Sequence, residues 1–224
     1  MFPLLSQNVS YSLVQSQDDR SEVSEKLNSK IYLNMTFTDE AGNTKTIREM
    51  FAGQSTLIIT FNYFRCTTMC TYQFLNLSES LQQVGLPVGK GYAVASISFD
   101  PTDTSQRAQT TRDIWLTQLG QNTLNTPWHF YVSANSVQTQ KLTDSLNFYF
   151  QADEDGNYSH TAGLFFINKD GTFSRYLYGI VYNSSYIKYA LIDTSHGAVG
   201  NFFDKLKLKF FKYNQQGKYD FFLM

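Results

Sequence analysis

The strongest constraint on the fold of this chain is the stretch Thr56–Leu75, TLIITFNYFRCTTMCTYQFL. It begins with the apolar run Leu57–Phe61, in which β-branched and aromatic residues follow one another without alternation, a pattern typical of a central strand buried on both faces. From Thr71 onward, apolar residues recur at helical spacing as far as Val84, and a glycine and a proline follow shortly afterwards. The stretch therefore predicts a buried strand, a loop and a helix in succession.

The two cysteines of the chain, Cys66 and Cys70, lie in this loop. The free N–H groups and the dipole at a helix N-terminus stabilise a thiolate and lower its pKa. A separation of four residues puts both sulfur atoms on one side of a helical turn, close enough to share a metal ion or to form a disulfide. The plainer alternatives are two buried structural cysteines or an ordinary disulfide. CxxxC also differs from the CxxC of thioredoxins, and it lacks the second cysteine pair of a convincing zinc site.

Composition excludes one class of function. With 18 basic and 19 acidic residues, a net charge of −1, the chain offers no electrostatic footprint for nucleic acid, and no nucleic-acid partner is expected.

No stretch approaches the ~20 apolar residues of a membrane span. The start MFPLLSQNVSYSL lacks the basic region of a signal peptide, so we expect either a cytoplasmic chain or a trimmed mature one. A length of 224 residues suits one sizeable α/β domain with additions.

The region before the cysteine loop predicts an arm and a hairpin. Residues 1–30 are polar without a strong period and are expected to form an N-terminal arm, with one short helix near Ser21–Leu27. Ile31–Phe37 alternates apolar and polar residues as a half-buried strand does. Asp39–Asn43 then supplies a turn and Thr44–Ile47 a returning strand. A small N-terminal β-hairpin should therefore lead into the main domain.

Strands and helices are expected to alternate after the cysteine helix. We predict strands at Gly91–Phe99 and Trp128–Val132, helices at Ser105–Leu119 and Ser136–Leu146, an extended segment at Phe148–Phe150, a hairpin at Gly163–Asn168 and Thr172–Tyr178, and a last helix at Ser184–Thr194. Ile114 and Val137 are among the positions expected to face the core. This order predicts an α/β, thioredoxin-like domain over residues 31–197, with a redox or metal loop after the first core strand.

The end of the chain has a different character. Asn201–Met224 contains five lysines and two aspartates, interleaved with aromatic residues. Residues 198–224 are therefore predicted to form a basic, aromatic C-terminal extension, either as an amphipathic helix or as a strand. This extension would be a packed appendage of the domain or an element close to a membrane or a partner.

The three histidines differ as candidates for a further metal ligand. His129 falls within an expected strand and His196 just after a helix, where ordinary roles at a sheet edge and at a helix C-terminus explain them. His160 falls on the loop entering the terminal hairpin, which in a thioredoxin-like fold approaches the end of the first core strand. Together with Cys66 and Cys70 it would form a set of two sulfurs and one nitrogen. Such a set suits copper in either oxidation state better than magnesium or calcium, and zinc remains possible.

Three blocks of sequence, FNYFRCTTMCTYQF, SFDPTDT at 98–104 and SHTAGLFFINKDGTF at 159–173, resemble the SCO/SenC family of copper-binding cytochrome c oxidase assembly proteins. The resemblance covers roughly residues 50–195. It implies a thioredoxin-like fold and a site for copper, as Cu(I) or Cu(II), made by Cys66, Cys70 and His160. It also implies delivery of copper to the binuclear copper centre of the oxidase's second subunit, or reduction of the cysteines of that subunit.

The resemblance further implies that the partner is cytochrome c oxidase subunit 2 or another copper chaperone, and that the protein is periplasmic or bound to a membrane facing the periplasm. Some residues depart from the family pattern. Thr67 and Thr68 replace the usual Pro and Asp, and Ser159 replaces an acidic residue before the histidine. These changes remove carboxylates that could accept hydrogen bonds around a metal. Met69 is either a weak soft ligand or, as we expect, part of an apolar lip.

Three functions compete for the cysteine pair. A copper metallochaperone needs Cys66, Cys70 and His160, whereas a thiol-disulfide oxidoreductase uses the two cysteines as a redox-active pair, one thiolate attacking and the other resolving. The missing CxxC argues against the oxidoreductase, as does the lack of an obvious cis-proline opposite the site, for which Thr126-Pro127 is the one candidate. The third function, peroxide reduction of the peroxiredoxin type, is disfavoured because the surroundings of Cys66 lack that family's Pro-xxx-Thr-xx-Cys pattern. A metallochaperone is the expected function, and thiol reduction is the alternative.

Overall fold

The computed structural model describes residues 26–118, 120, 126–133 and 135–198. Its centre is a five-stranded sheet of order β5-β4-β3-β8-β9, in which β3, β4 and β5 run parallel while β8 and β9 are antiparallel to their neighbours. The strands are β3 (Thr56–Asn62), β4 (Tyr92–Ser98), β5 (Trp128–Tyr131), β8 (Gly163–Asn168) and β9 (Phe173–Tyr178). This mixed sheet confirms the predicted α/β, thioredoxin-like fold.

The two strands at the centre are buried at every residue, because helices cover both faces of the sheet. This burial is the reason why the β3 and β4 sequences do not alternate between apolar and polar residues. The parallel pairing of β3 with β4 runs from Thr56 opposite Tyr92 to Asn62 opposite Ser98. The carboxyl ends of both strands therefore meet at one edge of the sheet, where the cysteine loop begins.

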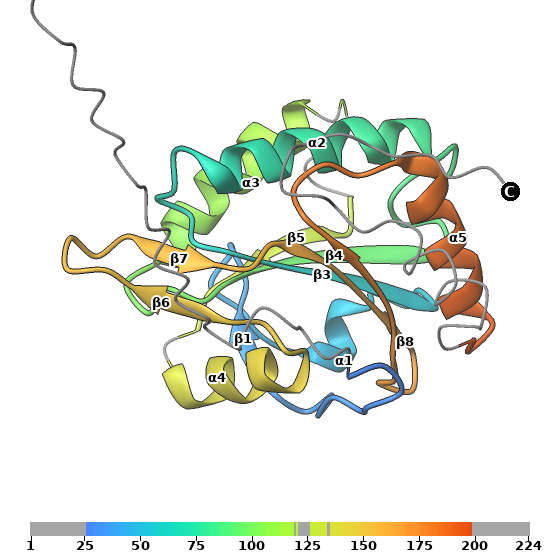
Figure 1. Cartoon of the computed structure of the whole chain (residues 1–224), viewed down its shortest axis with the longest axis horizontal. Helices are drawn as coiled ribbons and strands as arrows, with labels where there is room; N and C mark the ends of the chain where they lie inside the picture. Colours follow the sequence, from blue (N-terminus) through green and yellow to red (C-terminus); the bar gives the residue numbers. More distant parts are fainter. Residues whose placement is uncertain (1–25, 119, 121–125, 134, 199–224) are drawn as a thin grey trace, which may run out of the picture.

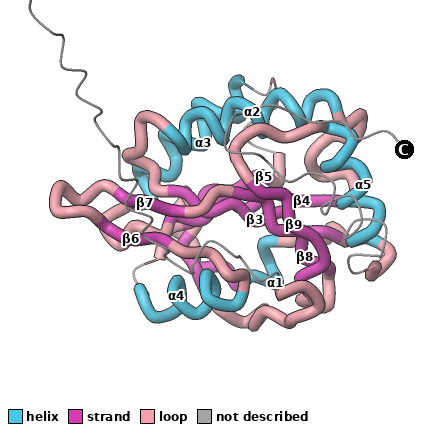
Figure 2. Tube along the Cα trace, viewed as in Figure 1, coloured by secondary structure: helices cyan, strands magenta, loops and turns pink. Residues whose placement is uncertain are grey.

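The helices form a layer on each face of the sheet (Figures 1 and 2). On one face α2 (Met69–Gln83) packs against both α3 (Ser105–Gln118) and α5 (Ser184–Ser195), while α1 (Ile47–Met50) and α4 (Ser136–Ser145) lie on the other. Phe74 of α2 stacks on Trp115 of α3, with ring centroids 5.4 Å apart. Aromatic packing of this kind ties α2, the helix after the cysteine loop, to its neighbour.

The expected inward positions of α3 and α4 are partly wrong. Ile114 is 57% exposed and Val137 is 60% exposed, although both were predicted to face the core. In α3 the buried face instead contains Arg112, whose Nε donates to the carbonyl oxygen of Trp128 at 2.9 Å. The guanidinium of Arg112 is also paired with Glu40 at 3.0 Å, which allows this charged residue to be buried. A search for apolar residues at helical spacing does not identify such a position.

The N-terminal hairpin is present but shorter than predicted. It consists of β1 (Thr36–Thr38) and β2 (Thr44–Thr46), so the expected strand Ile31–Phe37 is wrong for its first five residues. The returning strand ends one residue early because Thr46 caps α1.

Residues 31–35 nevertheless show the alternating burial of a strand. Ile31, Leu33 and Met35 are buried. Their backbone groups bond to different partners: Ile31 N donates to Gly171 O, and Leu33 O accepts from Arg48 N, both at 3.0 Å. Alternating burial thus arises here without a strand ladder.

A second hairpin stands apart from the central sheet. Its strands β6 (Phe150–Ala152) and β7 (Tyr158–His160) pair with each other in antiparallel register (Figure 1). Its turn is held by Asp153, whose Oδ1 accepts from Asn157 N at 2.7 Å. His160 is therefore the last residue of a strand and lies opposite Phe150, which corrects the prediction of a loop.

The predicted terminal segments fall mostly outside the described residues. This applies to the arm and its short helix up to residue 25 and to the C-terminal extension from residue 199. The last residues of the arm contact the domain, since Asn28 N donates to Phe173 O and Phe173 N donates to Ser29 O, both at 2.9 Å. The division into arm, domain and extension stays a prediction. In the part of the chain that the structure describes, no helix has the length and apolar character needed to cross a membrane.

Candidate metal centre

The cysteine loop connects the end of β3 to the start of α2. The helix begins at Met69, two residues earlier than predicted, so Cys70 lies in its first turn and Cys66 precedes the N-cap Thr68. Among the described residues no side-chain hydrogen bond from Thr68 caps the helix. The backbone N–H of Cys70 instead donates to the Sγ of Cys66 at 3.4 Å. The sulfur thus accepts from an N–H group that a helix N-terminus leaves free.

The two thiols differ in their protonation. Hydrogen bonds donated by the Cys70 thiol, by the Cys70 N–H and by the Tyr63 hydroxyl lower the pKa of Cys66 to about 4, against the opposing effect of burial. The same pairing with Cys66, together with burial, raises the pKa of Cys70. Burial and the bond to Cys66 raise the pKa of Tyr63 to about 12, so its hydroxyl keeps the proton that it donates. These opposite shifts favour a thiolate at Cys66 and a thiol at Cys70, and neither residue forms a disulfide.

His160 contacts the buried member of this pair. Its Nε2 lies 3.7 Å from the Sγ of Cys70, and its Nδ1 lies 2.6 Å from the carbonyl oxygen of Thr161. A ring nitrogen facing a carbonyl oxygen carries the proton, which leaves the Nε2 lone pair directed at Cys70. Burial lowers the pKa of His160 and so favours this neutral form. Neutral imidazole held through its second nitrogen is the form that binds metals.

Aromatic rings orient the imidazole of His160. The ring centroids of Phe99, Phe148 and Tyr63 lie 5.1, 5.9 and 6.0 Å from that of His160. These rings come from the ends of β4 and β3 and from the segment before β6. They pack around the imidazole, whose Nε2 faces Cys70.

Of the three predicted ligands, Cys70 contacts Cys66 and also contacts His160. Over the described ranges no three Cys, His, Asp or Glu side chains converge closely enough to hold a metal ion as they stand. A set of two sulfurs and one imidazole nitrogen fits a soft metal such as copper. The other two histidines lie elsewhere: His129 Nδ1 pairs with Glu40 Oε1 at 2.7 Å, and His196 caps α5 through its backbone N–H.

Comparison with protein families settles where the chain belongs. A family model described as SCO1/SenC matches residues 23–188, which is 166 of the 224 residues. The chain belongs to the SCO1/SenC family. No curated protein sequence matches it.

Solved structures of the same fold include members of this family. A protein of Aquifex aeolicus VF5, named as a candidate electron-transfer protein, is 22% identical with a TM-score of 0.66, over 77% of this chain and 95% of its own. Arabidopsis thaliana ScoI with copper bound is 14% identical with a TM-score of 0.58, over 73% and 96%. BsSco, a Sco-family cytochrome c oxidase assembly protein with a disulfide switch, is 16% identical with a TM-score of 0.56, over 76% and 95%. These likenesses show a shared fold.

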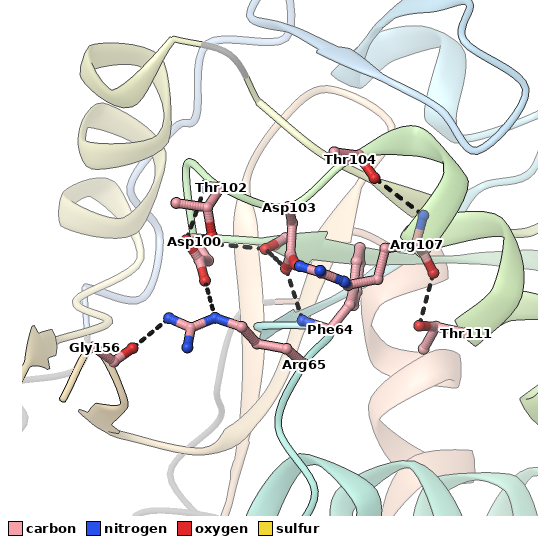
Figure 3. Close-up of polar contacts among 10 residues, drawn as sticks. Phe64, Arg65, Asp100, Thr102, Asp103, Thr104, Arg107, Thr111 and Gly156 are labelled. Carbon is pink, nitrogen blue, oxygen red and sulfur yellow. Dashed lines mark hydrogen bonds and ion pairs between the residues drawn. The ribbon is translucent and has the colours of Figure 1, made fainter.

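Two carboxylates after β4 hold the cysteine loop, and the sequence analysis assigned no role to them (Figure 3). Asp103 Oδ2 accepts from the backbone N–H of Phe64 at 2.7 Å, and Asp100 Oδ2 accepts from Nε of Arg65 at 2.8 Å. Their positions could have indicated this role, because parallel strands end at the same edge of a sheet. The SFDPTDT block of this SCO1/SenC protein therefore fixes the residues just before Cys66.

A chain of buried, hydrogen-bonded side chains lies beside the first turns of α2, and the sequence pattern did not predict it. Asn62 donates to Gln73 Oε1 at 2.9 Å, and Gln73 donates to the hydroxyl of Tyr182 at 2.9 Å. Asn62 and Gln73 have no exposed surface. The chain connects the end of β3, the first turns of α2 and the loop before α5, so it fixes where the helix places Cys70.

Proposed function

We propose that this protein is a copper metallochaperone that helps to assemble the binuclear copper centre of cytochrome c oxidase, with copper as its cargo and Cys66, Cys70 and His160 as ligands. The contact between Cys70 Sγ and His160 Nε2 carries this proposal. A pair of thiols is enough for disulfide exchange, so the neutral imidazole beside Cys70 is the feature that favours a metal site. The family's association with copper binding and oxidase assembly supports the proposal.

The protonation of the three groups indicates how copper would be taken up. Cys66 offers a thiolate at neutral pH, and His160 offers a neutral nitrogen. Cys70 must lose its proton when a metal binds, because ligation requires the thiolate. Uptake of copper therefore releases about one proton per site near neutral pH. Cys66 is partly exposed while Cys70 is buried, so an incoming ligand of a partner would meet Cys66 first.

Reduction of the oxidase's cysteines is the second candidate function, and the same pair supports it. The Cys66 thiolate is the attacking group, and the protonated Cys70 next to it is the resolving thiol. Two electrons would pass from the two thiols of this protein to a disulfide of the partner, leaving a Cys66–Cys70 disulfide. Both functions use the same sulfurs and can coexist.

The proposed partner is subunit 2 of the oxidase or another copper chaperone. Such a partner places the protein in the periplasm or on a membrane facing it, as the family resemblance implies. A role of residues 198–224 near that membrane is part of the same proposal.

Two assays on the soluble copper domain of subunit 2 separate the two functions. One follows copper transfer from the loaded protein to the reduced apo domain, and the other follows reduction of the oxidised domain without copper. H160A should lose most of the transfer while keeping the reduction, because it retains both thiols. H196A, an exposed histidine outside the site, is the matched control and should behave as wild type. Equal copper transfer by H160A and wild type would overturn the metallochaperone assignment.

A further inference from the structure

The hairpin that presents His160 lacks main-chain support from the central sheet. Within the described residues, β6 and β7 pair with each other and with no strand of the five-stranded sheet. The main chain joins His160 to the sheet only after β7, where Ala162 O accepts from Gly179 N at 2.9 Å just before β8, so the placement of the hairpin itself depends on side chains. Aromatic contacts supply part of the attachment, such as the stacking of Phe99 on Phe150 with centroids 4.7 Å apart. Apolar contacts are not directional, so they alone would let the hairpin shift relative to the cysteine loop. A directional polar contact is needed to fix its position.

We infer that Arg65 is a positioning residue of the metal centre, fastening the hairpin that carries His160 to the loop that carries Cys66. This inference rests on the proposed function and deepens it. Arg65 directly precedes Cys66 in the chain. Its Nη2 donates to the carbonyl oxygen of Gly156 in the β6–β7 turn, and its Nε donates to Asp100 Oδ2 at 2.8 Å (Figure 3).

Arg65 also contacts aromatic rings on both sides of the junction. Its guanidinium carbon lies 5.6 Å from the ring centroid of Tyr63 in the cysteine loop and 5.8 Å from that of Tyr158 in β7. A guanidinium presents several donors in one plane and stacks on aromatic faces at the same time. A lysine ammonium is a single point charge and cannot meet the turn carbonyl, the carboxylate and both rings together.

Asp100 gives the contact a fixed anchor. Its side chain has no exposed surface, and its Oδ1 accepts from the N–H of Thr102 at 2.9 Å and from the hydroxyl of the same residue at 2.7 Å. Burial and the charge of Asp100 raise the pKa of the Tyr158 hydroxyl. Asp100 therefore fixes the guanidinium of Arg65, whose central carbon lies 5.8 Å from the ring centroid of Tyr158 in the hairpin.

The link from this cluster to the ligand is short. Tyr158 and His160 are two residues apart in β7, so their side chains lie on the same face of the strand. The ring of Tyr63 contacts both, with centroids 5.1 Å from Tyr158 and 6.0 Å from His160. A hairpin released from Arg65 would therefore shift Tyr158 and, with it, the distance from His160 Nε2 to Cys70 Sγ.

The first test uses the full-length, metal-free, reduced protein and does not depend on copper. Amide hydrogen exchange is measured for residues 150–160 in wild type, R65M, R65K and the control R48M, which removes an exposed arginine of α1. R65M should speed exchange in the hairpin by about tenfold or more while leaving β3 and β4 unchanged, because only the hairpin loses an anchor. R65K should fall between R65M and wild type. Unchanged hairpin exchange in R65M would overturn the inference.

The second test adds Cu(II) to the same proteins and records charge-transfer absorption, EPR parameters and affinity. R65M should shift the EPR parameters and weaken binding about tenfold, as expected when a group that orients a ligand is lost. R48M should match wild type, and R65K should recover part of the wild-type spectrum. A loosened hairpin with wild-type copper spectra and affinity would overturn the inference. Copper binding that is unaffected by H160A would instead contradict the proposed function, so the two failures are distinguishable.

Discussion

The Sγ of Cys70 lies 3.7 Å from the Nε2 of His160, although 90 positions separate the two residues in the chain. Two different parts of the fold produce this contact. The end of β3 and the first turn of α2 place the thiol, and the separate β6–β7 hairpin returns the imidazole to it. Cys70 contacts both Cys66 and His160, so it links the two parts of the candidate site.

The lowered pKa of Cys66 predicts how its reactivity changes with pH. With a pKa of about 4, Cys66 stays a thiolate as the pH falls and is protonated only near pH 4. Alkylation of the reduced protein by iodoacetamide should therefore proceed at a nearly constant rate between about pH 6 and pH 8, whereas an ordinary thiol slows about tenfold per pH unit. Mass spectrometry of the modified peptide measures this rate.

The variant C70S tests the cause of that shift. Serine removes the sulfur partner and weakens the largest influence on the Cys66 pKa, so the rate of alkylation should become more dependent on pH. A tenfold fall per pH unit in the wild-type protein would show that Cys66 is an ordinary thiol and would contradict the assigned protonation.

Removal of Gln73 should destabilise the protein through the buried polar chain. Gln73→Leu leaves the Nδ2 of Asn62 without its acceptor in a buried position, which should lower the free energy of unfolding by about 1–3 kcal/mol. Urea unfolding followed by circular dichroism measures the change. Gln82→Leu is the matched control because Gln82 lies in the same helix, is exposed and donates to Gln118 O at 3.2 Å. Equal stability of the two variants would refute a supporting role for Gln73.

The ion pair between Glu40 and Arg112 should matter far more than an exposed pair. Both side chains are nearly buried, at 10% and 8% exposure, so Glu40→Ala leaves an uncompensated cation and should lower the free energy of unfolding by about 3 kcal/mol or more. Lys30→Met breaks an ion pair with Asp170 that is largely exposed on both sides and should cost less than about 1 kcal/mol. Thermal and urea unfolding of both variants compare the two effects. A loss for Glu40→Ala as small as that for Lys30→Met would contradict the burial of the pair.

Much of the central sheet could be predicted because its sequence is locally unambiguous. Unbroken apolar runs matched β3, β4 and β8, and the helical spacing after Cys70 matched α2 to within two residues. The strand prediction for Ile31–Phe37 failed because alternation of apolar and polar residues indicates burial and does not identify hydrogen-bond partners. The partners of this segment include Gly171, more than a hundred residues away, and Arg48 in α1.

The candidate ligands were predicted from residue types and remain a prediction, whereas most of the residues that surround them were not singled out from the sequence. Cys66 and Cys70 stood out because they lie at a predicted strand-to-helix junction, and His160 because it lies on a loop expected to approach that junction. Arg65 pairs with Asp100 across the ends of β3 and β4, whereas its contact with Gly156 depends on how the β6–β7 hairpin folds back. No local pattern encodes that return, because aromatic packing and long-range polar contacts determine it.

The most direct test of the copper site is titration of the fully reduced protein with Cu(II), followed by absorption and EPR, in wild type, H160A and the control H196A. We predict a one-to-one complex with intense sulfur-to-copper charge transfer in wild type and H196A, and its loss in H160A. Weak, substoichiometric binding that H160A does not change would contradict a copper centre made by Cys66, Cys70 and His160, and would leave the protein as a thiol-disulfide oxidoreductase.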